Sequence, residues 1–187
     1  MHNFNEKKIS ELVDKISIKD SEKALKELYT YYFEKLARFV LLYAKSEEST
    51  EEIISDTFLI IWQNRKKLPE IKNFNSYIYK IARNKAISYY RTVNMHYETI
   101  NDTIPIDLYY NTYTTPEEEM IEKEMIEKLD RTINSLPTQC KIVYKLIRED
   151  QMKYKEAADV LNISVKTLEA HMTRAIKELR KTLNSTI

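Results

Sequence analysis

The 187-residue sequence contains no glycine. Gly-rich phosphate-binding loops and dinucleotide-binding fingerprints depend on backbone conformations that only glycine adopts at low cost. The absence of glycine therefore argues against most nucleotide-dependent enzymes. The sequence also has a single cysteine, Cys140, which excludes an internal disulfide framework and fits a reducing cytoplasm.

Long hydrophobic runs are missing as well. The longest apolar stretches, such as residues 39–44, fall far short of the roughly 20 residues that a membrane-spanning helix needs. The first four residues lead straight into charged residues, so we expect no export signal. These features predict a cytoplasmic protein. Because hydrophobic residues still make up 43% of the chain, we expect a folded core.

Few residues are suited to catalysis. The histidines His2, His96 and His171 are scattered, and no cluster of carboxylates and histidines has the spacing of a metal site. Cys140 stands among apolar residues of a predicted helix, where a cysteine is more often a packed small hydrophobe than a nucleophile. We therefore expect no enzymatic activity, no metal or other cofactor, and no small-molecule substrate.

The net charge of +1 hides a strong segregation of charge along the chain. Residues 65–91 hold eight basic residues and one acidic residue, whereas residues 92–119 hold six acidic residues and no lysine or arginine. Residues 1–64 carry a balance of −3 and residues 120–187 a balance of +3. A basic block beside an acidic one predicts a surface that binds a polyanion and a separate segment that avoids it.

Apolar residues recur at spacings of three and four over most of the chain, which is the pattern of amphipathic helices. A capping box at Ser49 predicts the start of the third helix, and Pro69 predicts its end near Lys67. No alternating run of strand length occurs, so we predict an all-α fold. The expected helices span about 5–16, 20–45, 49–67, 75–91, 116–136, 138–148, 153–161 and 165–183.

The helical periodicity disappears over residues 92–115, which are acidic and rich in Asn, Thr and Tyr. We interpret this region as a flexible linker. The sequence therefore predicts two helical domains, at residues 1–95 and 116–187, joined by an acidic linker at residues 96–115.

A helix-turn-helix pattern lies near the C-terminus. Residues 155–161 form a short predicted helix, Asn162 is suited to a left-handed turn, and Ser164 is a good N-cap for the helix that follows. A helix-turn-helix places its second helix in the major groove of DNA. The alternative is an ordinary helical hairpin with a solvated charged face; the spacing favours DNA binding but is not sufficient to establish it.

The basic block also contains aromatic residues. Stacking of a base on an aromatic side chain is worth ~1–3 kcal/mol, and neighbouring cations follow the phosphates, so this pattern suits unpaired nucleic acid. The alternative is that the tyrosines are core residues, which we favour for Tyr89, and that the cations are solvated. The residues concerned are Tyr77, Tyr79, Tyr89 and Tyr90 among Lys80, Arg83, Lys85 and Arg91.

Three segments together resemble the extracytoplasmic-function (ECF) group of bacterial RNA polymerase sigma factors. Residues 51–62 (EEIISDTFLIIW) resemble the family's polymerase-binding helix, and residues 74–86 (FNSYIYKIARNKA) its promoter-melting helix, which reads the −10 element. Residues 136–171 are similar to its −35-binding helix-turn-helix domain. The segments have the family's order and spacing, and the resemblance covers about residues 20–91 and 120–183.

The resemblance implies a subunit without catalytic activity that binds core RNA polymerase and directs promoter-specific initiation. It implies recognition of the −10 and −35 elements and help in melting the DNA. The N-terminal domain would be similar to sigma region 2 and the C-terminal domain to sigma region 4. Besides core polymerase and promoter DNA, an anti-sigma factor at the membrane is an implied partner.

The residue patterns and the resemblance together assign candidate contacts to three groups of residues. Polymerase contacts are expected at Asp56, Phe58, Trp62 and Asn64, although we expect Trp62 to be largely core. Contacts for −10 recognition and melting are expected at Leu68, Lys72, Phe74, Tyr77, Lys80, Arg83, Asn84 and Lys85. Contacts to the −35 element are expected at Lys166, Thr167, Glu169, Ala170, His171, Thr173 and Arg174.

The sequence departs from the family pattern at three points. The pair Asp150-Gln151 stands in a turn where the family often has glycine, Asn162 stands at another such position, and Lys153 stands where the family often has Ser or Thr as a cap. A lysine side chain cannot accept the capping hydrogen bond, so the start of that helix is in question.

The competing interpretations are a conventional helix-turn-helix regulator with a helical sensor domain, and a helical adaptor without any role in nucleic-acid binding.

Overall fold

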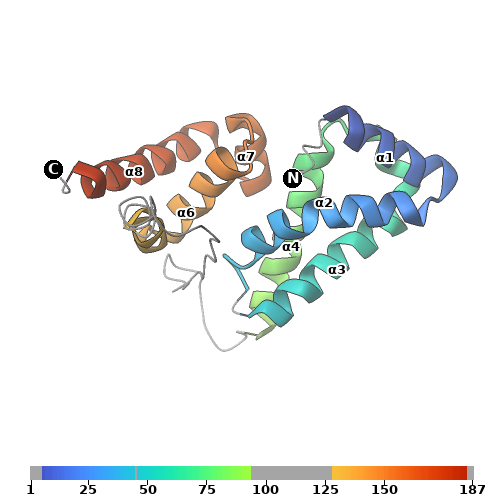
Figure 1. Cartoon of the computed structure of the whole chain (residues 1–187), viewed down its shortest axis with the longest axis horizontal. Helices are drawn as coiled ribbons and strands as arrows, with labels where there is room; N and C mark the ends of the chain where they lie inside the picture. Colours follow the sequence, from blue (N-terminus) through green and yellow to red (C-terminus); the bar gives the residue numbers. More distant parts are fainter. Residues whose placement is uncertain (1–5, 45, 94–127, 185–187) are drawn as a thin grey trace, which may run out of the picture. The chain divides into compact units, whose positions relative to one another are not determined.

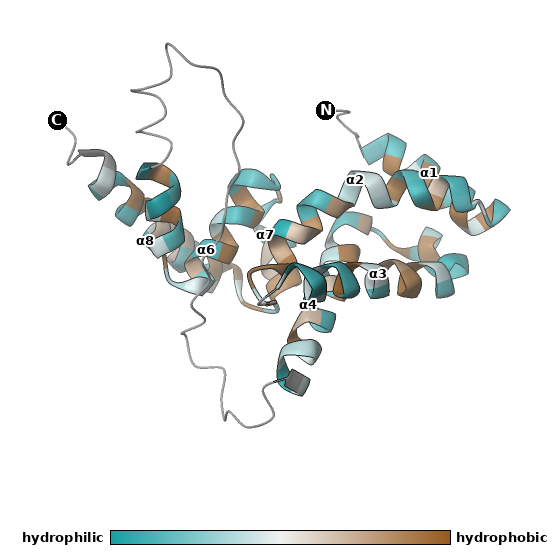
Figure 2. Ribbon diagram, turned by 60° about the horizontal axis from the view of Figure 1, so that its bottom comes forward, coloured by the Kyte–Doolittle hydropathy of each residue, from teal (hydrophilic) through white to brown (hydrophobic). Residues whose placement is uncertain are grey.

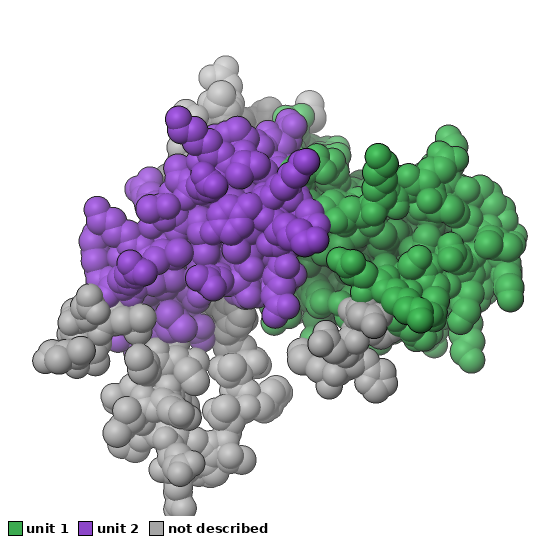
Figure 3. Space-filling view, turned by 90° about the horizontal axis from the view of Figure 1, so that it is seen from above, with its two compact units in different colours: residues 1–98, 159–161 green, residues 99–158, 162–187 purple. Residues whose placement is uncertain are grey.

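A computed structural model describes residues 6–44, 46–93 and 128–184. Helices make up the regular structure of these residues, which confirms the predicted all-α fold. The chain divides into two compact units, residues 1–98 with 159–161 and residues 99–158 with 162–187 (Figure 3). The predicted linker at 96–115 and the helix start expected near residue 116 lie outside the described residues.

Figure 1 shows the order of the helices along the chain. The N-terminal part contains α1 (Glu6–Lys19), α2 (Glu22–Val40), α3 (Glu47–Gln63), the 3-10 helix η1 (Arg65–Glu70) and α4 (Phe74–Val93). The C-terminal part contains a helix at residues 128–135, α6 (Thr138–Tyr144), a π-helical turn (Lys145–Glu149), α7 (Tyr154–Leu161) and α8 (Val165–Asn184).

The first unit is built around α2, which packs against α1, α3 and α4. Figure 2 shows hydrophobic residues as recurring bands along these helices. Aromatic contacts join α2 to α4: the ring centroids of Phe39 and Tyr79 lie 5.1 Å apart, and those of Tyr32 and Phe74 lie 6.0 Å apart. These contacts hold the first two turns of α4, the helix that carries predicted −10 residues.

Helix α3 begins earlier than the sequence predicted. Its N-cap is Ser46, whose Oγ accepts a hydrogen bond from the backbone N–H of Ser49 at 3.2 Å. Ser49 lies inside the first turn and is buried, so its expected capping box does not form. The expectation failed because Ser46 and Ser49 are both suitable cap residues, and sequence alone does not rank them.

The end of α3 also differs from the expectation. The α-helix stops at Gln63, and the chain continues as the 3-10 helix η1, which contains Pro69. Proline disfavours α-helical geometry at the preceding residue, so the chain tightens before it turns into α4. The side chain of Asn73 then caps α4 by accepting from the backbone N–H of Ser76 at 2.8 Å.

The core of the C-terminal part lies between α6 and α8. Leu136 and Cys140 pack against Ala175, with Tyr144 at the edge of the cluster. A buried lysine, Lys145, follows directly after α6. It forms ion pairs of 3.1 and 3.3 Å with two acidic residues, Glu149 and Asp150. Burying this charge is tolerated because both partners are close.

Candidate functional site

The predicted helix-turn-helix is present as α7, a short turn and α8. Asn162 has a φ of 55°, and the N–H of Ile163 bonds to the carbonyl of Ala158 at 3.0 Å, as in a Schellman helix end. Ser164 then caps α8 by accepting from the N–H of Thr167 at 3.0 Å. Both turn residues therefore act as the sequence predicted.

The start of α7 shows how the chain does without a capping side chain at Lys153. The carboxylate of Glu156 accepts a hydrogen bond from the backbone N–H of Lys153 at 3.1 Å. This is the reciprocal half of a capping box, formed here without a Ser or Thr partner. In the preceding turn Gln151 has a φ of 56°, a left-handed conformation that glycine adopts at lower cost.

Helix α8 has one buried face and one exposed face. Leu168, Met172, Ala175 and Leu179 form the buried stripe. Six of the seven predicted −35 residues are exposed, namely Lys166, Thr167, Glu169, Ala170, Thr173 and Arg174. The structure thus brings them to one accessible surface of α8 and its flanks.

His171, the seventh predicted residue, lies at the edge of the buried stripe. Its Nδ1 is 3.8 Å from Sγ of Cys140, and the histidine is only half-exposed. Burial raises the pKa of the Cys140 thiol, while the charge of Arg174 acts in the opposite direction. A thiol held in its neutral form is a packing group and not an activated nucleophile.

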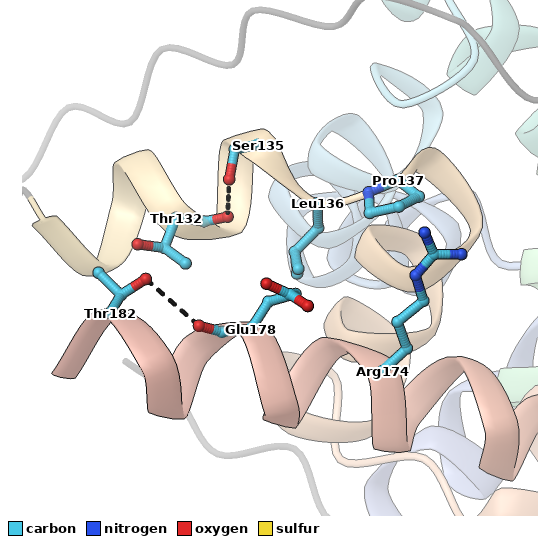
Figure 4. A pocket seen from close by; sticks show the side chains of 7 residues that line it. All are labelled: Thr132, Ser135, Leu136, Pro137, Arg174, Glu178 and Thr182. Atoms are coloured by element: carbon cyan, nitrogen blue, oxygen red, sulfur yellow. Dashed lines mark hydrogen bonds between the residues drawn. The ribbon is translucent and has the colours of Figure 1, made fainter. Parts of the chain in front are cut away.

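Arg174 and Thr167 have local roles beside the exposed face. Thr167 shares a 2.8 Å hydrogen bond between its hydroxyl and that of Ser164, which engages the hydroxyl in the cap. Arg174 extends from α8 toward Pro137 and lines a hollow of about 300 Å³ (Figure 4). The hydroxyls that line this hollow bond within their own helices, for example Thr182 to the carbonyl of Glu178. Arg174 is the basic residue of the lining.

In the first unit, Asp20 forms ion pairs with the first two residues of the basic block at 65–91. This aspartate ends α1 with a φ of 50° and forms an ion pair with Arg65 and another, of 3.0 Å, with Lys66. Lys66 also donates to the carbonyl of Ser17 at 2.8 Å. Hydrogen bonds from Arg65 and Lys66 lower the pKa of Asp20. These contacts fasten η1 to the end of α1.

Trp62 is mostly buried but keeps an accessible part. The guanidinium of Arg65 lies over its ring, 4.4 Å from the ring centroid. A cation over the face of an indole is a favourable arrangement and leaves the other parts of the ring partly accessible. Asn64, next to it, caps the end of α3 through a 2.9 Å bond from its amide to the carbonyl of Ile60.

An ion pair of 2.9 Å joins Asp56 on α3 to Lys85 on α4. The sequence assigned these residues to different partners, polymerase and DNA. Arg83, two residues before Lys85 on α4, places its positive charge near Tyr43. Burial raises the pKa of Tyr43 to about 12, and Arg83 partly offsets the rise.

Three predicted contact residues are core residues in the structure, and this corrects their assignment. Leu68, Phe74 and Phe58 are 1%, 8% and 5% exposed, so none presents its side chain to a partner. Phe58 packs on Tyr29, with ring centroids 4.9 Å apart. The other −10 residues are accessible: Lys72 and Asn84 are exposed, and Tyr77, Lys80, Arg83 and Lys85 are partly exposed.

Two accessible residues were missed by the sequence reasoning. Leu59 on α3 is 52% exposed although it is large and apolar, and Lys177 is exposed on α8. The sequence held a usable signal for both, the helical phase. Leu59 falls outside the apolar stripe that contains Ile54, Phe58 and Ile61, and Lys177 lies opposite the stripe of α8.

The fold and the surfaces described above define an all-helical, helix-turn-helix protein of the DNA-binding class. Family comparison specifies the class further: residues 28–94 match sigma-70 region 2, and residues 126–179 match sigma-70 region 4. The chain belongs to the ECF-type RNA polymerase sigma factors. It is a transcription-initiation factor of a family that binds core RNA polymerase and promoter DNA and is not enzymatic.

Characterised relatives span most of the chain. The ECF sigma factor SigM of Bacillus subtilis is 25% identical over 84% of this chain and 94% of its own length. The sigma factor CnrH of Cupriavidus metallidurans is 23% identical over 88% of this chain and 89% of its own. Similarity therefore extends over both the region 2 and the region 4 parts.

Solved structures show the same fold. CnrH in complex with the cytosolic domain of CnrY has 20% identity, covers 95% of this chain and 98% of the solved chain, and gives a TM-score of 0.60. RpoE in complex with the anti-sigma factor NepR from Bartonella quintana has 17% identity, covers 87% of this chain and 98% of the solved chain, and gives a TM-score of 0.60.

Among the helices that the structure describes, none has the length and apolar character to cross a bilayer.

Proposed function

We propose that this sigma factor divides promoter recognition between three surfaces. The outer face of α8 binds the −35 element, η1 with α4 binds and opens the −10 element, and the outer face of α3 binds core polymerase. The observation that carries the proposal is the exposed polar face of α8, which follows a capped helix-turn-helix whose opposite face is buried.

We propose domain limits of 1–95 and 116–187, with a linker at 96–115. The region 2 match at 28–94 and the region 4 match at 126–179 fall inside these limits. Helix α4 runs to Val93, which supports a first domain ending close to residue 95. The acidic composition between the domains suits a segment that avoids the phosphates bound by its neighbours.

The proposed polymerase surface consists of Asp56, Leu59 and Trp62 on the accessible side of α3, together with Asn64 at its C-cap. Leu59 is the largest exposed apolar group there, and Asp56 and Trp62 are partly exposed beside it. Interfaces typically combine a central apolar or aromatic group with polar groups at the rim. Phe58 is left out because its ring packs in the core.

The proposed −10 surface follows the same reasoning. Lys72 and Asn84 are exposed, and Tyr77 is partly exposed, with its ring centroid 6.4 Å from that of the buried Phe74. A tyrosine fixed in this way is suited to stack on an unpaired base, while lysines contact phosphate. Leu68 and Phe74 are buried beneath this surface and do not form part of it. Lys80, Arg83 and Lys85 complete it.

We further propose a cytoplasmic location, where core polymerase is found, and control by an anti-sigma factor. Two structurally similar proteins were solved in complexes that support this: CnrH with the cytosolic domain of CnrY, and RpoE with the anti-sigma factor NepR. A membrane-bound anti-sigma partner would keep the protein from polymerase until a signal releases it.

The test is run-off transcription with purified bacterial core polymerase on DNA from upstream of the protein's own gene. Initiation at a defined start that requires this protein would support the proposal. If no transcript forms, core binding is measured directly by co-elution. Binding to core without any promoter-dependent initiation on a library of fragments would contradict the proposed DNA surfaces.

A further inference from the structure

The outward face of α8 carries a row of four residues, Lys166, Ala170, Thr173 and Lys177. Each lies two positions before a member of the buried stripe of α8. Because successive residues of an α-helix are turned by about 100°, two positions place the row nearly opposite the core. All four residues are exposed. This row is therefore the part of the helix that enters a groove most deeply.

The longer polar side chains lie on the flanks of this row. Arg174 extends to the side, toward Pro137, where it lines the hollow between α8 and the helix at residues 128–135 (Figure 4). Thr167 uses its hydroxyl in the cap of α8. The centre of the row is left to two short side chains, Ala170 and Thr173, which allow close approach of the helix to base edges.

The chemistry of these two side chains restricts what they can read. Ala170 offers only a methyl group. Thr173 offers a methyl group and a hydroxyl that has no hydrogen-bond partner within the described residues. In the major groove, alanine and threonine methyl groups contact the 5-methyl group of thymine, which no other base carries.

The lysines at the two ends of the row are free to bind phosphate. Neither Lys166 nor Lys177 forms a salt bridge with any residue of the described part of the chain. They are eleven positions apart, which corresponds to about 16 Å along the helix, against a groove about 12 Å wide. Their side chains can therefore reach the phosphates on both edges of the groove.

We propose that α8 reads thymine in the −35 element through the methyl groups of Ala170 and Thr173. Lys166 and Lys177 hold the helix across the groove by contacting phosphates on its two sides. This inference rests on the proposed function, because it specifies the chemistry by which the same helix face recognises DNA.

The test uses holoenzyme reconstituted from core polymerase and the full-length protein. Each thymidine of the −35 element is replaced in turn by deoxyuridine, which removes the 5-methyl group and keeps the base-pairing edge. Affinity is measured by competition for the promoter fragment. We expect a loss of about fourfold at one or two positions, the factor that corresponds to burial of one methyl group.

Three conservative variants identify the methyl groups on the protein. Thr173→Ser removes the methyl group and keeps the hydroxyl, whereas Thr173→Val keeps the methyl group and removes the hydroxyl. Ala170→Ser replaces the outermost methyl group with a polar group. The deoxyuridine penalty should disappear at one position in Thr173→Ser and at one in Ala170→Ser, and it should persist in Thr173→Val.

The lysines are tested through the salt dependence of binding. Lys166→Ala and Lys177→Ala should each reduce the slope of log affinity against log salt by about one, without changing the deoxyuridine penalty. Lys181→Ala is the matched control, because Lys181 is paired with Glu178 at 3.0 Å and should leave the slope unchanged.

The outcomes separate this inference from the proposed function. If −35 base-pair changes weaken binding but no deoxyuridine does, or if the penalty survives in both serine variants, the thymine inference is wrong while the function stands. If the holoenzyme ignores the −35 sequence altogether, or does not assemble, the proposed function fails and the inference with it.

Discussion

Asp56 and Lys85 connect two proposed functions within one domain. Their ion pair is 2.9 Å long, yet the side chains are 44% and 38% exposed. Exposed pairs of this kind contribute only ~0.2–1 kcal/mol to stability. Either residue can therefore exchange its partner for polymerase or phosphate at small cost to the fold.

We expect Asp56→Asn to weaken core binding, and Lys85→Gln to weaken binding of −10 DNA by the holoenzyme without changing core affinity. Urea unfolding of both variants and of the double variant should give a coupling energy below about 1 kcal/mol. Equal loss of core affinity in the two variants would show that the pair acts as a structural unit, contrary to this prediction.

Arg174 differs from the lysines of α8 because its guanidinium can bind either one phosphate or the two acceptors of guanine. We expect Arg174→Ala to reduce the salt slope of −35 binding by about one. Arg174→Lys should restore the slope, since a point charge is sufficient for phosphate. A lysine variant that stays as weak as the alanine variant would instead indicate bidentate contact with guanine.

At the scale of elements, helical phase was predictable and the details of helix ends were not. The apolar spacing located the helices, and it placed Leu168 in the core, where it is 0% exposed. It did not choose between Ser46 and Ser49 as the cap of α3, because the choice depends on how tertiary packing buries Ser49. Nor did it show that Lys145 would be buried: its partners Glu149 and Asp150 are only four and five residues away, but its burial depends on tertiary packing.

The candidate site was predictable in outline for a related reason. Residue type marks what can bind DNA, but burial decides which residues are accessible. Leu68 and Phe74 are buried because η1 and the start of α4 fold back onto α1 and α2. Leu59 was overlooked because an apolar residue in an apolar helix is ordinarily assigned to the core, and its exposure is evident only from the packing of α3.

The phase of α8 can be tested by one core truncation. Leu168→Ala should lower the free energy of unfolding by ~2–5 kcal/mol, because it removes a fully buried side chain and leaves a cavity. Lys166→Ala, on the opposite face, is the control and should change stability by less than about 0.5 kcal/mol. Denaturant unfolding followed by circular dichroism measures both. A silent Leu168→Ala would mean that α8 is rotated.

The attachment of η1 to α1 makes a further prediction at this scale. Asp20→Asn removes the charge that holds Arg65 and Lys66, so η1 loses its anchor. We expect slower open-complex formation, measured by permanganate footprinting, with core binding retained. Asp14→Asn is the control, because Asp14 is exposed on α1 and has no ion pair with any residue that the structure describes. Loss of core binding in Asp20→Asn would show a general folding defect instead.

The anchor is also expected to depend on pH. The pKa of Asp20 is lowered on folding by its hydrogen bonds to Arg65 and Lys66. Its contribution to stability is therefore present above the unfolded value of about 3.9 and is lost as the pH falls through the lower folded value. The stability difference between the protein and Asp20→Asn should be present at pH 7 and shrink below about pH 4. A difference that is constant from pH 7 into acid would rule out the charge as its origin.

For the whole molecule, initiation requires that polymerase binding and promoter binding occur in one complex. The two compact units carry the two proposed promoter-reading surfaces, and α3 of the first unit carries the proposed polymerase surface. A defect confined to α3 should then abolish transcription even though the helix-turn-helix is intact. Leu59 is suited to this test because it is 52% exposed and contributes little to the core.

We expect Leu59→Glu to lower the affinity for core polymerase by at least tenfold, since ~1.4 kcal/mol is less than a well-placed apolar anchor commonly contributes to an interface. Run-off transcription should fall in parallel, and adding excess variant should restore it, because only complex formation is impaired. Ile18→Glu is the matched control: Ile18 is 71% exposed on α1, outside the proposed surface. If both variants bind core normally, polymerase contacts another face of the protein, and the assignment of α3 is wrong.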